Sequence, residues 1–95
     1  MPVTVIADVP LKPERADYVL ALIERLLPDT LAFPGCLDVE VLVDRDVPGH
    51  IVLLETWESQ ADHRRYSAWR LDSGTAFSSP EVMAGPIRVS YFDVR

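Results

Sequence analysis

The chain has 95 residues, 48% of them hydrophobic, and this size and composition suit one globular domain spanning residues 1–95. Its net charge of -6 argues against binding to nucleic acid, because phosphate contacts require clustered Lys and Arg residues. No stretch approaches the roughly 18 apolar residues of a membrane span, and no signal peptide is recognisable, so we expect a cytoplasmic protein that makes no membrane contact.

The first third of the chain predicts a strand followed by a long helix. Residues 2–9 (PVTVIADV) are rich in β-branched residues and predict the first strand. Apolar residues then recur at three- and four-residue spacing from Ala16 to Leu27, which predicts a helix with one apolar stripe. Pro13 suits the first turn of this helix. Pro28 is expected to bend or end it, because proline removes a backbone hydrogen bond.

The middle of the chain predicts two strands joined by a turn. Residues 36–44 (CLDVEVLVD) alternate apolar and acidic side chains, as in a half-buried strand. The apolar members are expected to share one face: Leu37, Val39, Val41 and Val43. A turn at Pro48 and Gly49 leads to a third strand at residues 51–57 (IVLLETW).

The last third predicts a second helix and a closing strand. Ser59 can cap a helix that runs to about Leu71, with Asp62 near its positive end. Residues 72–86 are irregular, with a turn of helix expected near Phe77. Residues 87–94 (IRVSYFDV) predict the fourth strand.

The order β-α-β-β-α-β predicts the α+β class and a ferredoxin-like protomer with an antiparallel sheet. Two helices can cover only one face of that sheet. The other face is apolar too, since one set of hydrophobic residues alternates with a second: Ile6, Leu42, Val52 and Leu54 against Val5, Val41, Ile51 and Leu53. A second subunit can cover this face, so we expect a homodimer packed sheet to sheet.

Residues 33–59 (FPGCLDVEVLVDRDVPGHIVLLETWES) carry a family resemblance. The PGC triplet opens a strand, and E-x-W-x-S at residues 55–59 precedes a helix. In this order the motifs resemble the antibiotic biosynthesis monooxygenase domain. The resemblance implies a dimeric α/β barrel with a pocket between the sheet and the helices of each protomer. Relatives include oxygenases that oxidise phenolic or quinol-like substrates without metal or flavin, and others that degrade haem.

Haem degradation is not favoured for this chain. Haem-degrading relatives use an asparagine on the first strand, a tryptophan near Trp57 and a histidine on the second helix. This sequence contains no asparagine, and Ala7 and Asp8 occupy the candidate strand positions. Tyr66 stands where many relatives carry the helical histidine.

Glu55 and Trp57 are candidate site residues on one face of the third strand. Trp57 is either a pocket wall that offers its indole N–H to a substrate oxygen, or a core residue whose N–H meets a backbone carbonyl. Glu55, if buried, would have a raised pKa and could accept a proton near neutral pH. Its alternative is an ion pair with an arginine such as Arg88.

His63, Tyr66 and Arg70 share one stripe of the second helix by three- and four-residue spacing. If this stripe faces the pocket, Tyr66 can donate a hydrogen bond to a phenolate or carbonyl, and His63 can shuttle a proton. Otherwise Tyr66 belongs to the packing face of the helix. For His63, its charged neighbours and early position favour a solvated side chain.

Arg88 is a candidate because relatives with oxygenase activity use an arginine in the last strand, which can hold a substrate oxyanion. A salt bridge to Glu55 or Glu40 explains it equally well. We expect no metal site, since the single cysteine and the two histidines, thirteen positions apart, match no ligand spacing. The resemblance implies no other cofactor.

These features lead to two hypotheses. The first is a cofactor-independent monooxygenase that oxidises a small aromatic phenol or quinol with O2. Trp57 and Tyr66 would hold the ring, Arg88 would stabilise the oxyanion, and Glu55 or His63 would take the proton. The alternative is a non-catalytic dimeric module that binds a small apolar ligand or scaffolds a partner, and its pocket would lack converging polar groups.

Overall fold

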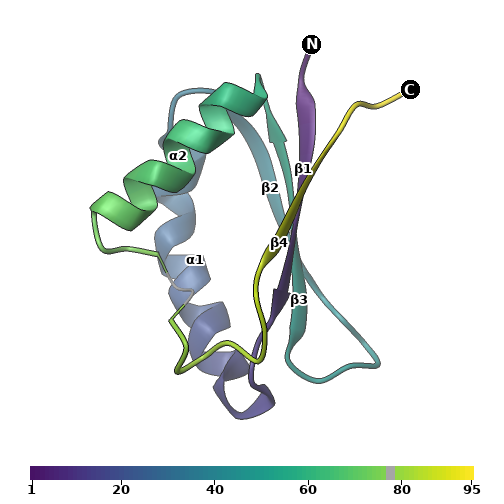
Figure 1. Ribbon diagram of the computed structural model, residues 1–95, viewed down its shortest axis with the longest axis vertical. Helices are drawn as coiled ribbons and strands as arrows, with labels where there is room; N and C mark the ends of the chain where they lie inside the picture. The colour runs from purple at the N-terminus through teal and green to yellow at the C-terminus, as the bar shows by residue number, and fades with distance from the viewer. Residues whose placement is uncertain (77–78) are drawn as a thin grey trace.

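The computed structural model describes residues 1–76 and 79–95, so the turn of helix expected near Phe77 lies outside the described residues. The elements follow in chain order: β1 (Val3–Pro10), a 3-10 turn η1 (Pro13–Arg15), α1 (Ala16–Ala32), β2 (Cys36–Val43), β3 (His50–Trp57), α2 (Gln60–Asp72) and β4 (Arg88–Phe92). All neighbouring strands are antiparallel, in the order β2-β3-β1-β4. Both helices lie on one face of the sheet (Figure 1). The predicted ferredoxin-like α+β fold is confirmed.

Helix α1 continues through its proline. Pro28 lies inside the helix, which runs on to Ala32, so an end at this residue was a wrong prediction. Proline leaves the carbonyl four residues earlier, that of Glu24, without its helical partner. Both residues are exposed, and water can bond to this carbonyl. Val19 and Ile23 from the predicted apolar stripe are buried against the sheet. Neither α1 nor any other helix in the described ranges is long and apolar enough to cross a membrane.

The start of β2 breaks the alternation that its sequence predicts. Cys36 pairs with Trp57, but Asp38 pairs with the next residue along, Thr56, so the register shifts by one residue at Leu37. This bulge leaves Leu37 48% exposed and puts Cys36 on the face that Val39 shares. The unpaired extra residue thus reverses the side-chain phase at the start of the strand and interrupts the predicted strict alternation.

The PGC triplet lies between α1 and β2 in the chain and packs against the start of α2. Gly35 has a φ of 94°, which favours glycine, and its carbonyl accepts a hydrogen bond from the Glu58 amide at 2.8 Å. A Cβ atom at this position would lie 2.5 Å from Cγ of Asp62. Asp62 belongs to the first turn of α2, which Ser59 caps as predicted. Glycine thus allows the helix start to sit directly against the turn.

The face of the sheet away from the helices is not covered by any element of the described chain (Figure 1). We call this the open face. Its apolar residues are Ile6, Leu42, Val52, Leu54 and Phe92. Leu42 and Phe92 are 45% and 49% exposed, whereas Val5 and Ile51 on the helix-covered face are buried. The predicted alternation of two apolar faces is confirmed.

Candidate functional site

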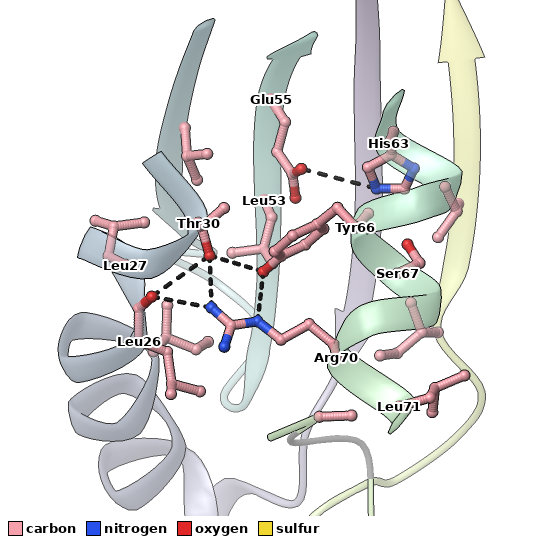
Figure 2. A pocket seen from close by; sticks show the side chains of 16 residues that line it. Leu26, Leu27, Thr30, Leu53, Glu55, His63, Tyr66, Ser67, Arg70 and Leu71 are labelled. Atoms are coloured by element: carbon pink, nitrogen blue, oxygen red, sulfur yellow. Dashed lines mark hydrogen bonds and ion pairs between the residues drawn. The ribbon is translucent and has the colours of Figure 1, made fainter. Parts of the chain in front are cut away.

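A cavity of about 220 Å³ lies between the sheet and the two helices, the position that the resemblance implies. Leucine, isoleucine and valine side chains from the helices and from β2, β3 and β4 form most of its walls. Six polar side chains also line it: Thr30, Glu55, His63, Tyr66, Ser67 and Arg70 (Figure 2). The cavity is therefore apolar in its body, with polar groups converging on it.

Glu55 supplies a buried carboxyl group to this cavity. It is 5% exposed, and one oxygen, Oε1, accepts a hydrogen bond from Nε1 of Trp57 at 2.7 Å. Burial raises the pKa of Glu55, and the Trp57 bond opposes part of that rise. Trp57 itself is fully buried against Phe33 and Tyr66. It is a core residue, as one alternative predicted, but its N–H meets a carboxyl group and not a backbone carbonyl.

His63 lies beside Glu55 and is buried, so the expected solvated side chain was a wrong prediction. Its Nε2 is 3.8 Å from Oε1 of Glu55, and its Nδ1 is 2.9 Å from the hydroxyl of Tyr91 on β4. Burial lowers the pKa of His63. The prediction weighed its charged neighbours, but the turn of α2 points Arg64 and Arg65 outward and His63 toward the sheet.

The Glu55–His63 pair is suited to proton transfer. A carboxyl group normally gives up its proton to imidazole, because its pKa lies about two units lower. Here burial raises the pKa of the acid and lowers the pKa of the base, which brings the two proton affinities closer. A proton taken from a ligand in the cavity can then be returned without a large penalty.

Tyr66 belongs to a second polar group that joins the helices. Its hydroxyl oxygen accepts a hydrogen bond from Nε of Arg70 at 2.8 Å and lies 2.7 Å from Oγ1 of Thr30 on α1. Arg70 also donates from Nη2 to Oγ1 of Thr30 at 2.8 Å and to the carbonyl of Leu26 at 2.9 Å. Figure 2 shows this network bridging α1 and α2 along the cavity.

Arg88 is not part of this constellation. Its register partner is Asp8 on β1, and it lies on the open face with Ser90 and Phe92. Glu55 lies on the opposite face, so the structure does not bring Arg88 to the cavity or to that carboxylate. No ion pair of Arg88 is found among the described residues.

His50 is half-buried near the end of the open face. Its Nδ1 is 2.6 Å from Oδ2 of Asp44 and its Nε2 is 2.5 Å from Oδ1 of Asp8. These contacts raise the pKa of His50, while the bond from His50 lowers the pKa of Asp44 to about 2. The cluster lies on the far side of the sheet from the cavity, so it takes no part in the candidate site.

Comparison with known proteins was made by sequence and by structure. The family model described as "antibiotic biosynthesis monooxygenase" matches residues 2–69. This chain belongs to the antibiotic biosynthesis monooxygenase family. The match includes Glu55, Trp57, His63 and Tyr66 and ends one residue before Arg70. No protein of the curated set gave a significant match.

Solved structures of other proteins share the fold of this chain. A crystal structure described as an antibiotic biosynthesis monooxygenase is 29% identical, with a TM-score of 0.84, and the alignment covers 98% of each chain. Rv0793 from Mycobacterium tuberculosis is 22% identical, with a TM-score of 0.83 over 100% of this chain and 96% of that one. PA3566 from Pseudomonas aeruginosa is 19% identical, with a TM-score of 0.80 over 96% and 91%. The last two show the fold alone.

The family motifs do not reveal the Thr30–Tyr66–Arg70 network. The helical stripe that predicted His63 and Tyr66 as partners also contains Arg70, so its position was visible but its role was not. Thr30 is 40 residues away on α1, and no local spacing joins it to Arg70. Only the packing of the helices against each other brings the two together.

Proposed function

We propose that this family member is a cytoplasmic homodimer that oxidises a small aromatic hydroxyl compound with O2, without flavin or metal. The observation that carries the proposal is the buried Glu55–His63 pair, which lines a cavity with a mainly apolar body. An apolar cavity holds an aromatic ring, and the paired acid and base can remove the hydroxyl proton. The converging polar groups favour this function over a purely apolar binding module.

The chemistry requires little beyond proton transfer and placement. Loss of the hydroxyl proton to Glu55 gives a phenolate, which donates one electron to O2 more readily than the phenol does. Superoxide and the ring radical combine at a ring carbon that bears hydrogen, and Glu55 returns its proton to the peroxide. Glu55, now ionised again, removes the carbon-bound proton as the O–O bond breaks, and it passes this proton to the departing hydroxide. One oxygen atom becomes a carbonyl, the other leaves as water, and the substrate supplies all the electrons.

The size of the cavity limits the substrate. An apolar cavity of about 150 Å³ in another protein takes up benzene. At about 220 Å³, this cavity suits one ring or two fused rings. A naphthol or naphthalenediol is therefore a suitable first substrate, and larger polycyclic phenols are expected to react slowly.

The open face supports the homodimer. A contiguous apolar sheet face in water is unfavourable, and a second copy can cover it sheet to sheet. Leu42 and Phe92 lie on this face with large exposed areas. The cavity lies on the opposite face of the sheet, so each protomer keeps a complete site.

Oxygen uptake by the metal-free protein with a panel of naphthols and naphthalenediols tests the proposal. Glu55→Gln keeps an acceptor for the Trp57 N–H but cannot take a proton, so it is expected to lower kcat at least about a hundredfold. Arg65→Gln, at an exposed position on α2, is the control and is expected to keep full activity. Binding of these compounds without uptake above autoxidation would favour the non-catalytic module, and equal uptake by the Glu55→Gln variant would refute the assigned base.

A further inference from the structure

Arg70 is a buried positive charge held by neutral oxygen atoms. It is 7% exposed and lines the cavity. Its four hydrogen-bond acceptors are the Tyr66 hydroxyl, the Thr30 hydroxyl, the Leu26 carbonyl and the Thr75 hydroxyl, at 2.8–3.1 Å. The described residues contain no carboxylate paired with it. The guanidinium therefore has bonded N–H groups but no counter-charge.

A buried charge without an opposite charge is unfavourable, and proteins normally pair it. The hydrogen bonds of Arg70 explain how α1 and α2 are tied together. The guanidinium also lies over the rings of Tyr66 and Trp69, at 5.2 and 4.8 Å from their centroids, which favours a cation. Neither these rings nor the hydrogen bonds supply an opposite charge. In an apolar cavity this uncompensated charge creates a positive potential that attracts an anion.

We propose that the substrate carries a carboxylate group, which binds against Arg70 while its ring lies in the apolar cavity. Arginine binds carboxylates with strong, directional hydrogen bonds, and a guanidinium has five N–H donors, one more than the four bonds found here. The Tyr66 hydroxyl lies next to the guanidinium and can add a donor. The substrate class is then a hydroxyaryl carboxylic acid of one or two rings.

The two charged groups of the cavity are separate enough to fit such a molecule. Figure 2 shows the Tyr66 ring between the Glu55 carboxyl group and the Arg70 guanidinium, and no ion pair joins the two. A carboxylate at Arg70 therefore avoids the acidic side chain. The hydroxyl group of the same ring system can then face Glu55 and His63. The inference rests on the proposed function only in assigning that hydroxyl group as the one oxidised.

Binding of matched acids and amides, measured by calorimetry under anaerobic conditions, tests the carboxylate without any turnover. We expect naphthoate and hydroxynaphthoate to bind at least about tenfold more tightly than naphthamide and hydroxynaphthamide, the ratio that one charge-assisted hydrogen bond supplies. Equal affinities of acid and amide would overturn the inference. If Arg70 instead favoured the hydroxylated compounds over the unhydroxylated ones, with no difference between acid and amide, the bound anion would be a phenolate. This result would overturn the inference too.

Variants assign the preference to Arg70. Arg70→Gln is expected to reduce the acid-to-amide ratio to about one, while Arg70→Lys keeps the charge and part of the ratio. Arg65→Gln removes the same charge from the exposed side of α2 and is expected to keep the full ratio. If Arg70→Gln does not fold, the acid-to-amide affinity ratios of the wild type and of Arg70→Lys still test the inference. Oxygen uptake is a separate result. Preference for acids without oxygen uptake supports this inference and refutes the oxygenase. Oxygen uptake with neutral phenols, without a preference for acids, supports the oxygenase and refutes this inference.

Discussion

The hydrogen bond from Trp57 to Glu55 should contribute more to the free energy of unfolding when Glu55 is ionised than when it is protonated. Trp57→Phe removes the N–H that reaches Oε1 at 2.7 Å while keeping an aromatic ring in the core. Because this bond lowers the pKa of Glu55, its loss should raise that pKa further. A raised carboxyl pKa gives stability that is present below its ordinary value of 4.5 and lost as pH rises through the folded-state value. The variant should therefore lose more stability at alkaline than at acidic pH.

The expected magnitude follows from two contributions. A hydrogen bond to a charged group contributes about 1.5–3 kcal/mol, and a bond to a neutral group about 0.5–1.5 kcal/mol. The smaller ring also leaves a gap in a fully buried site, which costs about 1 kcal/mol or more. Trp57→Phe should thus cost about 3 kcal/mol when Glu55 is ionised and about 2 kcal/mol in a Glu55→Gln background. The difference, about 1 kcal/mol, is the coupling between the two side chains.

Urea unfolding at fixed protein concentration, followed by far-UV circular dichroism at acidic and alkaline pH, measures these values. Trp69→Phe is the matched control, because this side chain is 36% exposed and forms no hydrogen bond to an acidic side chain among the described contacts. Its cost should be smaller and independent of pH. The reasoning fails if Trp57→Phe destabilises the protein equally at both pH values and in both backgrounds.

Three further predictions concern other parts of the molecule. Gly35→Ala should cost more than Gly74→Ala in urea unfolding, by about 1 kcal/mol or more, since both have positive φ but only the first would place a Cβ atom against α2. Equal costs would mean that the helix start simply moves aside. Leu42→Glu on the open face should convert the proposed dimer to a monomer in light scattering, whereas Leu31→Glu, at a similarly exposed position on α1, should not. Unchanged mass in both variants would refute the proposed sheet-to-sheet dimer. The raised pKa of His50 gives stability that is complete below its ordinary value of 6.5 and lost as pH rises through the folded-state value. His50→Gln should therefore remove this decrease from thermal unfolding curves measured between about pH 6 and pH 9, and a retained decrease would point to another group.

The strand and helix pattern was predictable because it depends on local periodicity. Residues that alternate along β1 and β3 are buried and half-buried in turn, and the Ser59 cap forms at the predicted position. The resemblance added the location of the pocket, which the structure has, and a dimeric barrel, which stays a prediction. The bulge at Leu37 was not predictable, because an extra residue in a strand is visible only against the partner strand.

The site was predictable only in part, because the positions of several side chains depend on how the helices and the sheet pack against each other. Glu55 was placed correctly because strand alternation fixes its face. His63 was assigned to solvent, since sequence spacing does not give the rotation of a helix about its axis. Arg88 was a candidate by resemblance, but its register on β4 places it on the open face, opposite the cavity. The role of Arg70 became visible only from its contacts with Leu26 and Thr30, which lie 44 and 40 residues away in the sequence.

The position of α2 determines whether these groups act together. His63, Tyr66 and Arg70 project from one side of this helix, so any shift of the helix moves all three relative to Glu55 on the sheet. The helix is held near its start by Asp62 against Gly35, and near its end by the bonds of Arg70 to α1. A carboxylate bound at Arg70 would add a charge partner at the second of these anchors. Substrate binding would thereby favour the same placement of α2 that keeps His63 within 3.8 Å of the Glu55 carboxyl group.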